Sequence, residues 1–315
     1  MLKNPELALC SNRNVLPKRN ERSGSPEDWF SNDLLLKKGL IGVNFDFFVD
    51  WSGNPNVLTP VIWIKQVLSE GKVYADFLAD IKGNIINRFG EEFVRKLFQF
   101  SLNSALQLSF IILEDKQDWN NSESKVCLTA VHEDFNFNTE LLAIGAFKSV
   151  IQTYSGGAVR IGNKGLIYGT TNLECALSKT DSAYPGDLDM LLLDENGIPV
   201  AIFEFKKHTL SADVSRQTLS NYYPNPDGRK YDRLAIFKEY ILAKLGHDIP
   251  IILLFYPTNP LAEYGRAEVL TGSPGGLKAK AGGRFRLPQD NSENEYERII
   301  NLIPKFIKLY QEGAL

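Results

Sequence analysis

Acidic and basic side chains that could act together on a phosphate group gather between residues 185 and 208. Asp187 and Asp189 begin one apolar stretch, and Glu204 and Lys206 lie near the end of the next. Carboxylates crowded into an apolar setting repel one another, so a cation must neutralise them. Oxygen ligands without His or Cys select Mg²⁺ or Mn²⁺, and a nearby lysine can orient or help to deprotonate a water bound near the metal. These residues therefore predict Mg²⁺-dependent chemistry in which Mn²⁺ can substitute.

Two predicted strands would position these side chains. Residues 187–193 and 199–207 are apolar and strand-like, and the turn at 194–197 contains Asn-Gly, which favours a tight hairpin. Side chains alternate between the faces of a strand, so the two aspartates share one face, and the glutamate and lysine share a face of the next strand. Pairing through the turn brings Asp189 opposite Glu204.

This arrangement resembles the PD-(D/E)xK nuclease superfamily, whose motif is an acidic residue on one strand and, after a hairpin, Glu or Asp, any residue, and Lys. The resemblance covers about residues 138–258. It implies that Asp189, Glu204 and the carbonyl of Phe205 hold the metal and that Lys206 is the catalytic lysine. It also implies an α/β fold with a restriction-endonuclease-like core, a central mixed sheet flanked by helices, beside an N-terminal α+β region.

Two further acidic residues join the predicted metal ligands. Asp187 lies two residues before Asp189, and Glu140 begins a helix predicted over 140–154. Many nucleases of this superfamily carry an additional acidic residue on the helix before the core strands. The alternative for Glu140 is a first-turn glutamate favoured by the helix dipole.

Gln217 is predicted to contact nucleic acid from a helix over 211–223. Some RecB-like nucleases carry a Gln four residues before a Tyr on this helix. Here the fourth residue is Asn221, and Tyr222 comes one position late, so an ordinary polar helix residue is the other interpretation.

A basic segment lies in a chain that is mildly acidic overall. Lys plus Arg number 35 and Asp plus Glu number 38, a formal net charge of −3, so any polyanion must meet a local basic surface. Residues 269–289 contain no acidic residue and are predicted to form a mobile, glycine-rich loop that contacts nucleic acid, DNA rather than RNA, through its phosphates. A solvated loop is the alternative. The predicted contact residues are Lys278, Lys280, Arg284 and Arg286.

Length and composition indicate a globular protein. The chain has 315 residues, of which 43 % are hydrophobic and 23 % charged, which suits two domains or one elaborated domain, and no internal repeat is visible. The predicted parts are a flexible basic arm over 1–27, an α+β region over 28–132 for recognition or architecture, and the nuclease-like domain over 133–315.

The expected location is cytoplasmic, with no membrane association. The longest apolar run, 249–256, is far shorter than the roughly twenty residues of a membrane helix. Cys10, Cys127 and Cys175 are odd in number and lack metal-like spacing, which predicts neither a disulfide framework nor a zinc site and suits a reducing compartment.

The resulting prediction is a Mg²⁺-dependent endonuclease that hydrolyses phosphodiester bonds in DNA. A restriction or anti-phage defence role, in a homodimer or a larger defence complex, follows from the resemblance alone. Three alternatives stay open: a nucleotidyltransferase of the polymerase-β type using Asp187, Asp189 and Glu204; a catalytically silent nuclease-like module that binds nucleic acid; and an exposed Glu204–Lys206 ion pair beside turn aspartates.

Overall fold

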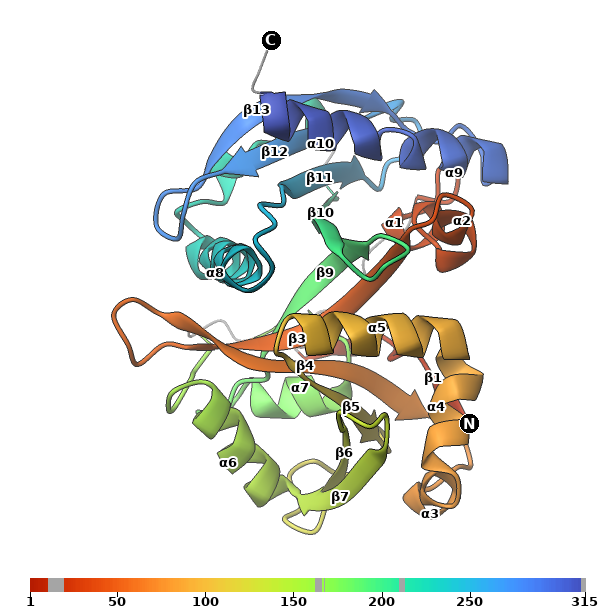
Figure 1. The fold of residues 1–315 in the computed structure, drawn as a ribbon, viewed down its shortest axis with the longest axis vertical. Helices are drawn as coiled ribbons and strands as arrows, with labels where there is room; N and C mark the ends of the chain where they lie inside the picture. Colours follow the sequence, from red (N-terminus) through yellow and green to blue (C-terminus); the bar gives the residue numbers. More distant parts are fainter. Residues whose placement is uncertain (11–19, 162–165, 167, 210–212, 313–315) are drawn as a thin grey trace. The chain divides into compact units, whose positions relative to one another are not determined.

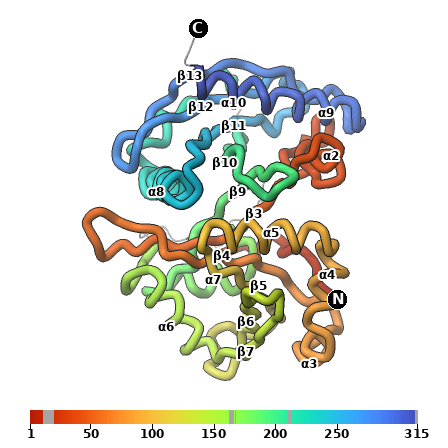
Figure 2. The backbone as a smooth tube through the Cα atoms, in the orientation of Figure 1, coloured from red at the N-terminus to blue at the C-terminus, as the bar shows by residue number. Residues whose placement is uncertain are grey.

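The computed structural model describes residues 1–10, 20–161, 166, 168–209 and 213–312, which divide into two compact units (Figures 1 and 2). Unit 1 comprises Met1–Leu16 and Phe45–Asp187, and unit 2 comprises Pro17–Asn44 and Leu188–Leu315. The chain passes from one unit to the other within strands β3 (Ile41–Asp50) and β9 (Gly186–Leu193).

Unit 1 is a mixed β-sheet with helices. Its strands follow the order β3-β4-β5-β6-β7, and β4 runs antiparallel to β3 and parallel to β5. A short strand, β1, pairs with the end of β4, and β2 pairs with β8 in a separate two-stranded sheet. Its remaining elements are β1 (Leu2–Lys3), β2 (Ala8–Leu9), β4 (Val57–Leu68), α3 (Tyr74–Leu78), α4 (Ile81–Phe89), α5 (Glu91–Asn103), β5 (Gln107–Leu113), β6 (Lys125–Val131), β7 (Phe137–Ala143), α6 (Ile144–Tyr154), β8 (Tyr168–Gly169) and α7 (Asn172–Leu177).

Unit 2 carries the predicted site on a mixed set of β-strands. Its strands follow the order β9-β10-β11-β12-β13, and only the β10–β11 pair is parallel. Its other elements are α1 (Pro26–Trp29), α2 (Asn32–Leu36), β10 (Pro199–His208), the 3₁₀ turns η1 (Val214–Arg216) and η2 (Leu219–Asn221), α8 (Gly228–Leu245), β11 (Ile251–Pro257), β12 (Tyr264–Thr271), β13 (Lys278–Arg286), α9 (Glu293–Ile300) and α10 (Ile303–Glu312).

The two units repeat one order of elements. Each contains an antiparallel hairpin, β3–β4 or β9–β10, from which the chain crosses through helix to a strand parallel to the second hairpin strand. Two further antiparallel strands follow, and then a helix in unit 1 or a pair of helices in unit 2. The sequence shows no such repeat, because the same order of elements needs only apolar residues at the buried positions, and many different sequences provide them.

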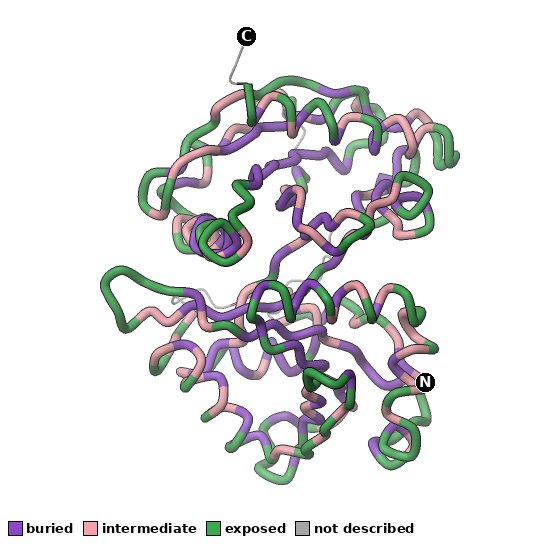
Figure 3. Tube along the Cα trace, in the orientation of Figure 1, coloured by how far each residue is buried: buried purple, intermediate pink, exposed green. Residues whose placement is uncertain are grey.

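Helices cover both faces of the unit 2 sheet. On one face an apolar core joins strand residues such as Phe203, Leu254 and Val269 to residues of α1, α2, α9 and α10. Helix α8 packs on β10 and β11 on the other face, beside η1. Strand β11 is buried along its whole length (Figure 3), as its continuous apolar sequence predicts. An α/β architecture with mixed sheets flanked by helices is therefore confirmed.

Several predicted elements differ from the observed ones. The sequence pattern predicts helices over residues 61–105, but 61–68 belong to strand β4. It also predicts a strand over 173–179, where 173–177 belong to helix α7. The expected domain boundary at 132/133 falls in the turn between β6 and β7, which pair along their whole length within unit 1. The polar loop there is a hairpin turn rather than a linker.

The described parts of residues 1–27 do not form a free arm. Strand β1 pairs with β4, and the side chain of Asn20 donates to the carbonyl oxygens of Pro257 at 3.4 Å and Asn259 at 3.1 Å. The basic residues Arg13, Lys18 and Arg19 lie outside the described residues.

A disulfide joins Cys10 to Cys175 within unit 1, against the expectation of unpaired cysteines. It links the segment after β2 to helix α7 across 165 residues of sequence, a pairing that sequence spacing alone could not indicate. Cys127 is a free, buried thiol on β6, and burial raises its pKa to about 11.

No helix in the described ranges is long and apolar enough to span a lipid bilayer.

We predict that reduction destabilises unit 1, because the cross-link closes a long loop that otherwise gains conformational freedom on unfolding. Reductant should lower the melting temperature of the wild type by roughly 10 °C. It should leave a Cys175→Ser variant unchanged, because that variant already lacks the cross-link. Three reactive thiols in unreduced, denatured protein would contradict the pairing.

Candidate active site

Asp189 and Glu204 lie on neighbouring strands of one sheet. The hairpin register pairs Phe203 with Met190, which places Asp189 beside Glu204. The main-chain amide of Phe205 donates to Oδ2 of Asp189 at 2.6 Å. The turn and a register shift between Pro199 and Ala201 together make Asp189 and Glu204 cross-strand neighbours, as the sequence predicted.

The Glu204 carboxylate is wholly buried between two lysines. Its residue is 0 % exposed, and Oε1 lies 2.7 Å from Nζ of Lys230 and 3.7 Å from Nζ of Lys206. Neither oxygen accepts a well-directed hydrogen bond within the described part of the chain. An uncompensated buried carboxylate would destabilise the fold by several kcal/mol, so these ammonium groups are needed for the strand to carry it.

Lys206 is held in place by a second carboxylate and two aromatic rings. Its Nζ donates to Oδ2 of Asp227 at 2.8 Å, and it lies 5.1 Å from the ring centre of Tyr222 and 5.3 Å from that of Tyr231. Such contacts hold the cationic side chain in place. The side chain is 15 % exposed, so it reaches solvent while remaining positioned.

The tyrosines around this cluster stay neutral. Burial, reinforced by the charge of Glu204, raises the pKa of Tyr231. Burial and the charge of Asp227 raise the pKa of Tyr222. Both hydroxyls therefore keep their protons across the physiological range.

Two arginines lie in a row with Lys206 on the same sheet face. Cross-strand partners point to one face of a sheet, and the register runs from Lys206 to Phe255, to Arg266 and to Arg284. Arg266 is fixed by a 2.8 Å ion pair with Glu268. Arg284 is exposed and lies over the ring of Tyr264 at 5.4 Å. The row links the buried site to the exposed edge strand.

The basic segment is strand β13 rather than a mobile loop. Gly282 and Gly283 sit within paired strand residues, and at Gly282 a side chain would approach Glu268 and Arg266 of the neighbouring strand. Arg284 and Arg286 pair with Arg266 and Tyr264 and share the face of Lys206.

The two lysines of β13, Lys278 and Lys280, lie on the sheet face opposite Lys206. An irregularity beside Val269 shifts the register, and Lys280 donates to the main-chain carbonyl of Tyr310 in α10, on the apolar-core side. Lys278 pairs with Thr271, which alternation places on that same side. The four predicted contact residues therefore divide into two pairs.

Gln217 follows the 3₁₀ turn η1 and does not lie on the α-helix expected over 211–223. Its Oε1 accepts a hydrogen bond from the hydroxyl of Tyr222 at 3.0 Å. Because the Tyr222 ring lies against Lys206, Gln217 contributes to positioning the lysine indirectly.

Glu140 and Asp187 belong to unit 1. Glu140 is exposed on strand β7, opposite Leu128, instead of at a helix start. The charge of Asp187 acts on a buried cluster built around Lys65, whose Nζ lies 3.3 Å from Oδ2 of Asp46 and pairs with Glu174. Glu140 lies well within the sequence of unit 1, whereas Asp187 is the last residue of that unit and, two positions before Asp189 on β9, shares the strand face of Asp189.

The Lys65 cluster has its own electrostatics. Burial raises the pKa of Asp46 to about 7, although Lys65 opposes that shift. Burial alone would lower the pKa of Lys65, but Asp46 and Glu174 outweigh it and raise the pKa. The ammonium also lies over the ring of Tyr184 at 4.5 Å. Lys65 therefore stays charged and balances the carboxylates.

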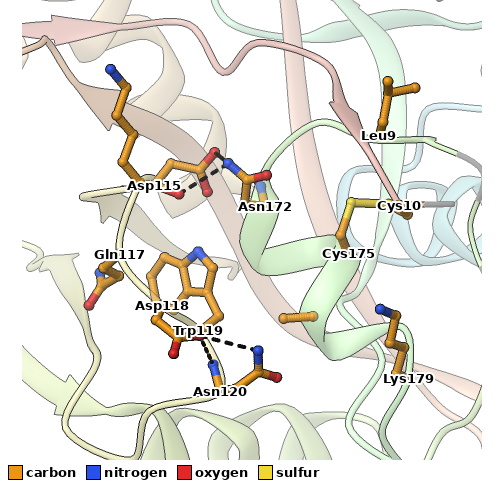
Figure 4. Close-up of a pocket in the computed structure, with 12 residues that line it drawn as sticks. Leu9, Cys10, Asp115, Gln117, Asp118, Trp119, Asn120, Asn172, Cys175 and Lys179 are labelled. Atoms are coloured by element: carbon orange, nitrogen blue, oxygen red, sulfur yellow. Dashed lines mark hydrogen bonds between the residues drawn. A yellow bond between two sulfur atoms is a disulfide. The ribbon is translucent and has the colours of Figure 1, made fainter. Parts of the chain in front are cut away.

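A polar hollow of about 500 Å³ in unit 1 lies beside the disulfide (Figure 4). The Asp115 carboxylate there accepts the main-chain amides of Asn172 at 3.0 Å and Leu173 at 3.3 Å, which caps helix α7. None of the predicted site residues lines this hollow.

The donor set of unit 2 fits a cation held by few protein ligands. No group of three or more His, Cys, Asp or Glu is arranged to hold a metal among the residues that the structure describes. The available oxygen ligands are the carboxylates of Asp189 and Glu204, together with the main-chain oxygen of Phe205. Mg²⁺ is bound by one or two carboxylates together with waters and substrate phosphates. The carboxylates of Asp189 and Glu204 are therefore ligands of the type and number that Mg²⁺ takes from a protein.

Sequence reasoning missed Asp227, Lys230 and the tyrosines around Lys206. The sequence Asn-Pro-Asp-Gly at 225–228 predicts only a turn, yet it leads directly into helix α8, which connects the parallel strands β10 and β11. The first turn of a crossover helix lies near the carboxyl ends of such strands, where ligands bind in α/β sheets. Applying that rule to the sequence could have identified Asp227 and Lys230 as site residues.

Comparisons with known proteins name no family. No protein-family model matches the chain, and no curated protein matches it. Among solved structures, the crystal structure of a sex pheromone staph-cAM373 precursor is 11 % identical over 90 % of this chain and 86 % of that chain, with a TM-score of 0.20. So low a TM-score carries no argument about fold or function.

We predict that Asp46 makes the stability of unit 1 depend on pH. The folded protein keeps a proton that the unfolded chain loses near pH 4, so this contribution is complete below about pH 4 and disappears as pH rises through about 7. The free energy of unfolding should therefore fall over that window in the wild type relative to Asp46→Asn, as urea titrations would measure. Asp134→Asn, a change in an exposed turn, should keep the wild-type slope; equal slopes in all three proteins would contradict the assignment.

Proposed function

We propose that the chain is a metal-dependent nuclease of PD-(D/E)xK type that hydrolyses phosphodiester bonds in DNA, with its site on unit 2. The observation that carries the proposal is the fully buried Glu204, beside Asp189 and two residues before Lys206 on an apolar strand. A carboxylate kept in such a costly position usually marks a functional site.

The metal would be held by Asp189, Glu204 and the carbonyl oxygen of Phe205. When bound, Mg²⁺ supplies positive charge to a phosphate oxygen and acidifies a water. The amide of Phe205 fixes the Asp189 carboxylate by a 2.6 Å hydrogen bond, so that ligand keeps its orientation before any cation arrives.

Lys206 supplies the positive charge on the protein side. Asp227 and the rings of Tyr222 and Tyr231 hold its ammonium group in one position. A preorganised cation at that point orients a water molecule or stabilises negative charge that develops on the phosphate.

The substrate backbone would follow the row of cations across the sheet. Arg266 is paired with Glu268, whereas Arg284 and Arg286 are exposed on the site's face. These two arginines are suited to phosphate contacts beside the scissile bond. A restriction or defence role, and assembly into a homodimer or larger complex, remain part of the proposal.

The first test removes the two charged groups separately. Glu204→Gln should abolish Mg²⁺-dependent nicking of supercoiled DNA, because it removes a ligand charge. Lys206→Ala should slow single-turnover cleavage by about 10²–10⁴-fold. Both should remain folded by melting temperature.

Matched controls lie on the same hairpin. Glu195→Gln in the exposed turn and Lys207→Ala, an exposed residue on the β10 face opposite Lys206, should cleave at the wild-type rate. A Lys206→Ala variant that cleaves normally would overturn the proposal, and incorporation of labelled nucleotide by the wild type would favour the nucleotidyltransferase.

The second test separates the two faces of β13. Arg284→Gln with Arg286→Gln should weaken DNA binding and flatten its dependence on salt by about one unit of slope per lost phosphate contact. Lys278→Gln with Lys280→Gln removes the same charge from the opposite face and should leave that slope unchanged. Fluorescence anisotropy over a salt series measures both, and equal slopes for the two pairs would contradict the assigned face.

A further inference from the structure

Lys230 is a second lysine at the site, and the PD-(D/E)xK motif does not contain it. It lies in the first turn of α8, and its Nζ is 2.7 Å from Oε1 of Glu204, an ångström closer than Nζ of Lys206. Lys206 has its own carboxylate partner in Asp227 at 2.8 Å. The charge of Glu204 is therefore balanced mainly from the helix.

A metal ion and this ammonium group would compete for the same oxygen. A Mg²⁺ ion at its usual distance of about 2.1 Å from Oε1 would lie no more than about 4.8 Å from Nζ of Lys230 as placed here. Glu204 is 0 % exposed, so little water screens the repulsion between the two cations. A metal ion on Oε1 is therefore disfavoured while Lys230 keeps this position.

The two lysines differ in their freedom to move. The Lys230 side chain is 32 % exposed, whereas that of Lys206 is 15 % exposed and lies between two aromatic rings. A long, partly exposed lysine can turn its ammonium group into solvent without a desolvation cost.

We propose that Lys230 is an internal counter-cation that neutralises Glu204 in the metal-free protein and must be displaced by the divalent ion. It thereby weakens metal binding and stabilises the protein without metal. Lys230 is a positioning residue in this scheme, acting through Glu204. The proposal rests on the proposed metal site, but it concerns binding and stability rather than cleavage.

Calorimetric titration with Mn²⁺ tests this competition. Lys230→Met keeps most of the side-chain length and removes the charge, so it should bind Mn²⁺ at least about tenfold more tightly than the wild type, because no charge-assisted contact has to be broken. Lys230→Arg keeps the charge and should bind no more tightly than the wild type.

Thermal unfolding gives a readout that does not depend on metal affinity. Without metal, Lys230→Met should melt at a lower temperature than the wild type, because Glu204 loses its nearest counter-charge, and saturating Mn²⁺ should raise that temperature by more than in the wild type. The double variant Glu204→Gln, Lys230→Met removes both charges, so it should recover stability and bind no Mn²⁺. Lys308→Met, on α10 and 68 % exposed, should match the wild type in both measurements.

The outcomes separate this inference from the proposed function. Tighter Mn²⁺ binding by Lys230→Met supports the inference even where no DNA is cleaved. Unchanged or weaker binding by a folded Lys230→Met, in a wild type that cleaves DNA with Mg²⁺, overturns the inference alone. Absence of Mn²⁺ binding in both proteins overturns the metal site and the inference together.

Discussion

The burial of the Glu204 carboxylate determines which charged side chains must surround it in unit 2. Glu204 lies on a strand surrounded by apolar residues and is 0 % exposed, so its charge can be tolerated only with cations close by. Lys206 comes from the same strand and Lys230 from helix α8. The helix and the strand must therefore dock together for either to be stable, and Asp227 at the start of the helix completes the balance by holding Lys206.

The sequence predicted correctly those elements that depend on residues close together in the chain. The β9–β10 hairpin follows from the Asn-Gly turn and strand alternation, and β11 follows from an unbroken apolar run. Strand β4 was read as helix because a strand buried on both faces loses the alternation that would identify it. Strand β13 was read as a loop because its glycines and charges are tolerated only through pairing with β12.

The site was predictable only as far as the hairpin reaches. Asp189, Glu204 and Lys206 are fixed by one turn and its register, whereas Lys230 comes from an element that follows the strand by a long irregular segment. Glu140 was grouped with the site by resemblance, but it lies on strand β7 of unit 1, whereas Asp187 shares the β9 face of Asp189 at the boundary between the units. The Cys10–Cys175 pair depends on contacts across 165 residues, which no local pattern contains.

The division of the chain between the units also determines which unit can fold first during synthesis. Unit 1 is built mainly from the continuous stretch Phe45–Asp187, whereas unit 2 joins Pro17–Asn44 to the stretch that begins at Leu188. A ribosome therefore releases the whole of that continuous stretch before the first residue of β10. Because domains fold as units during elongation, α1 and α2 must wait, with Trp29 and Leu35 uncovered, until the strands and helices of their own core have emerged. The nascent chain thus exposes an apolar N-terminal segment for most of translation, when a chaperone would have its best opportunity to bind it.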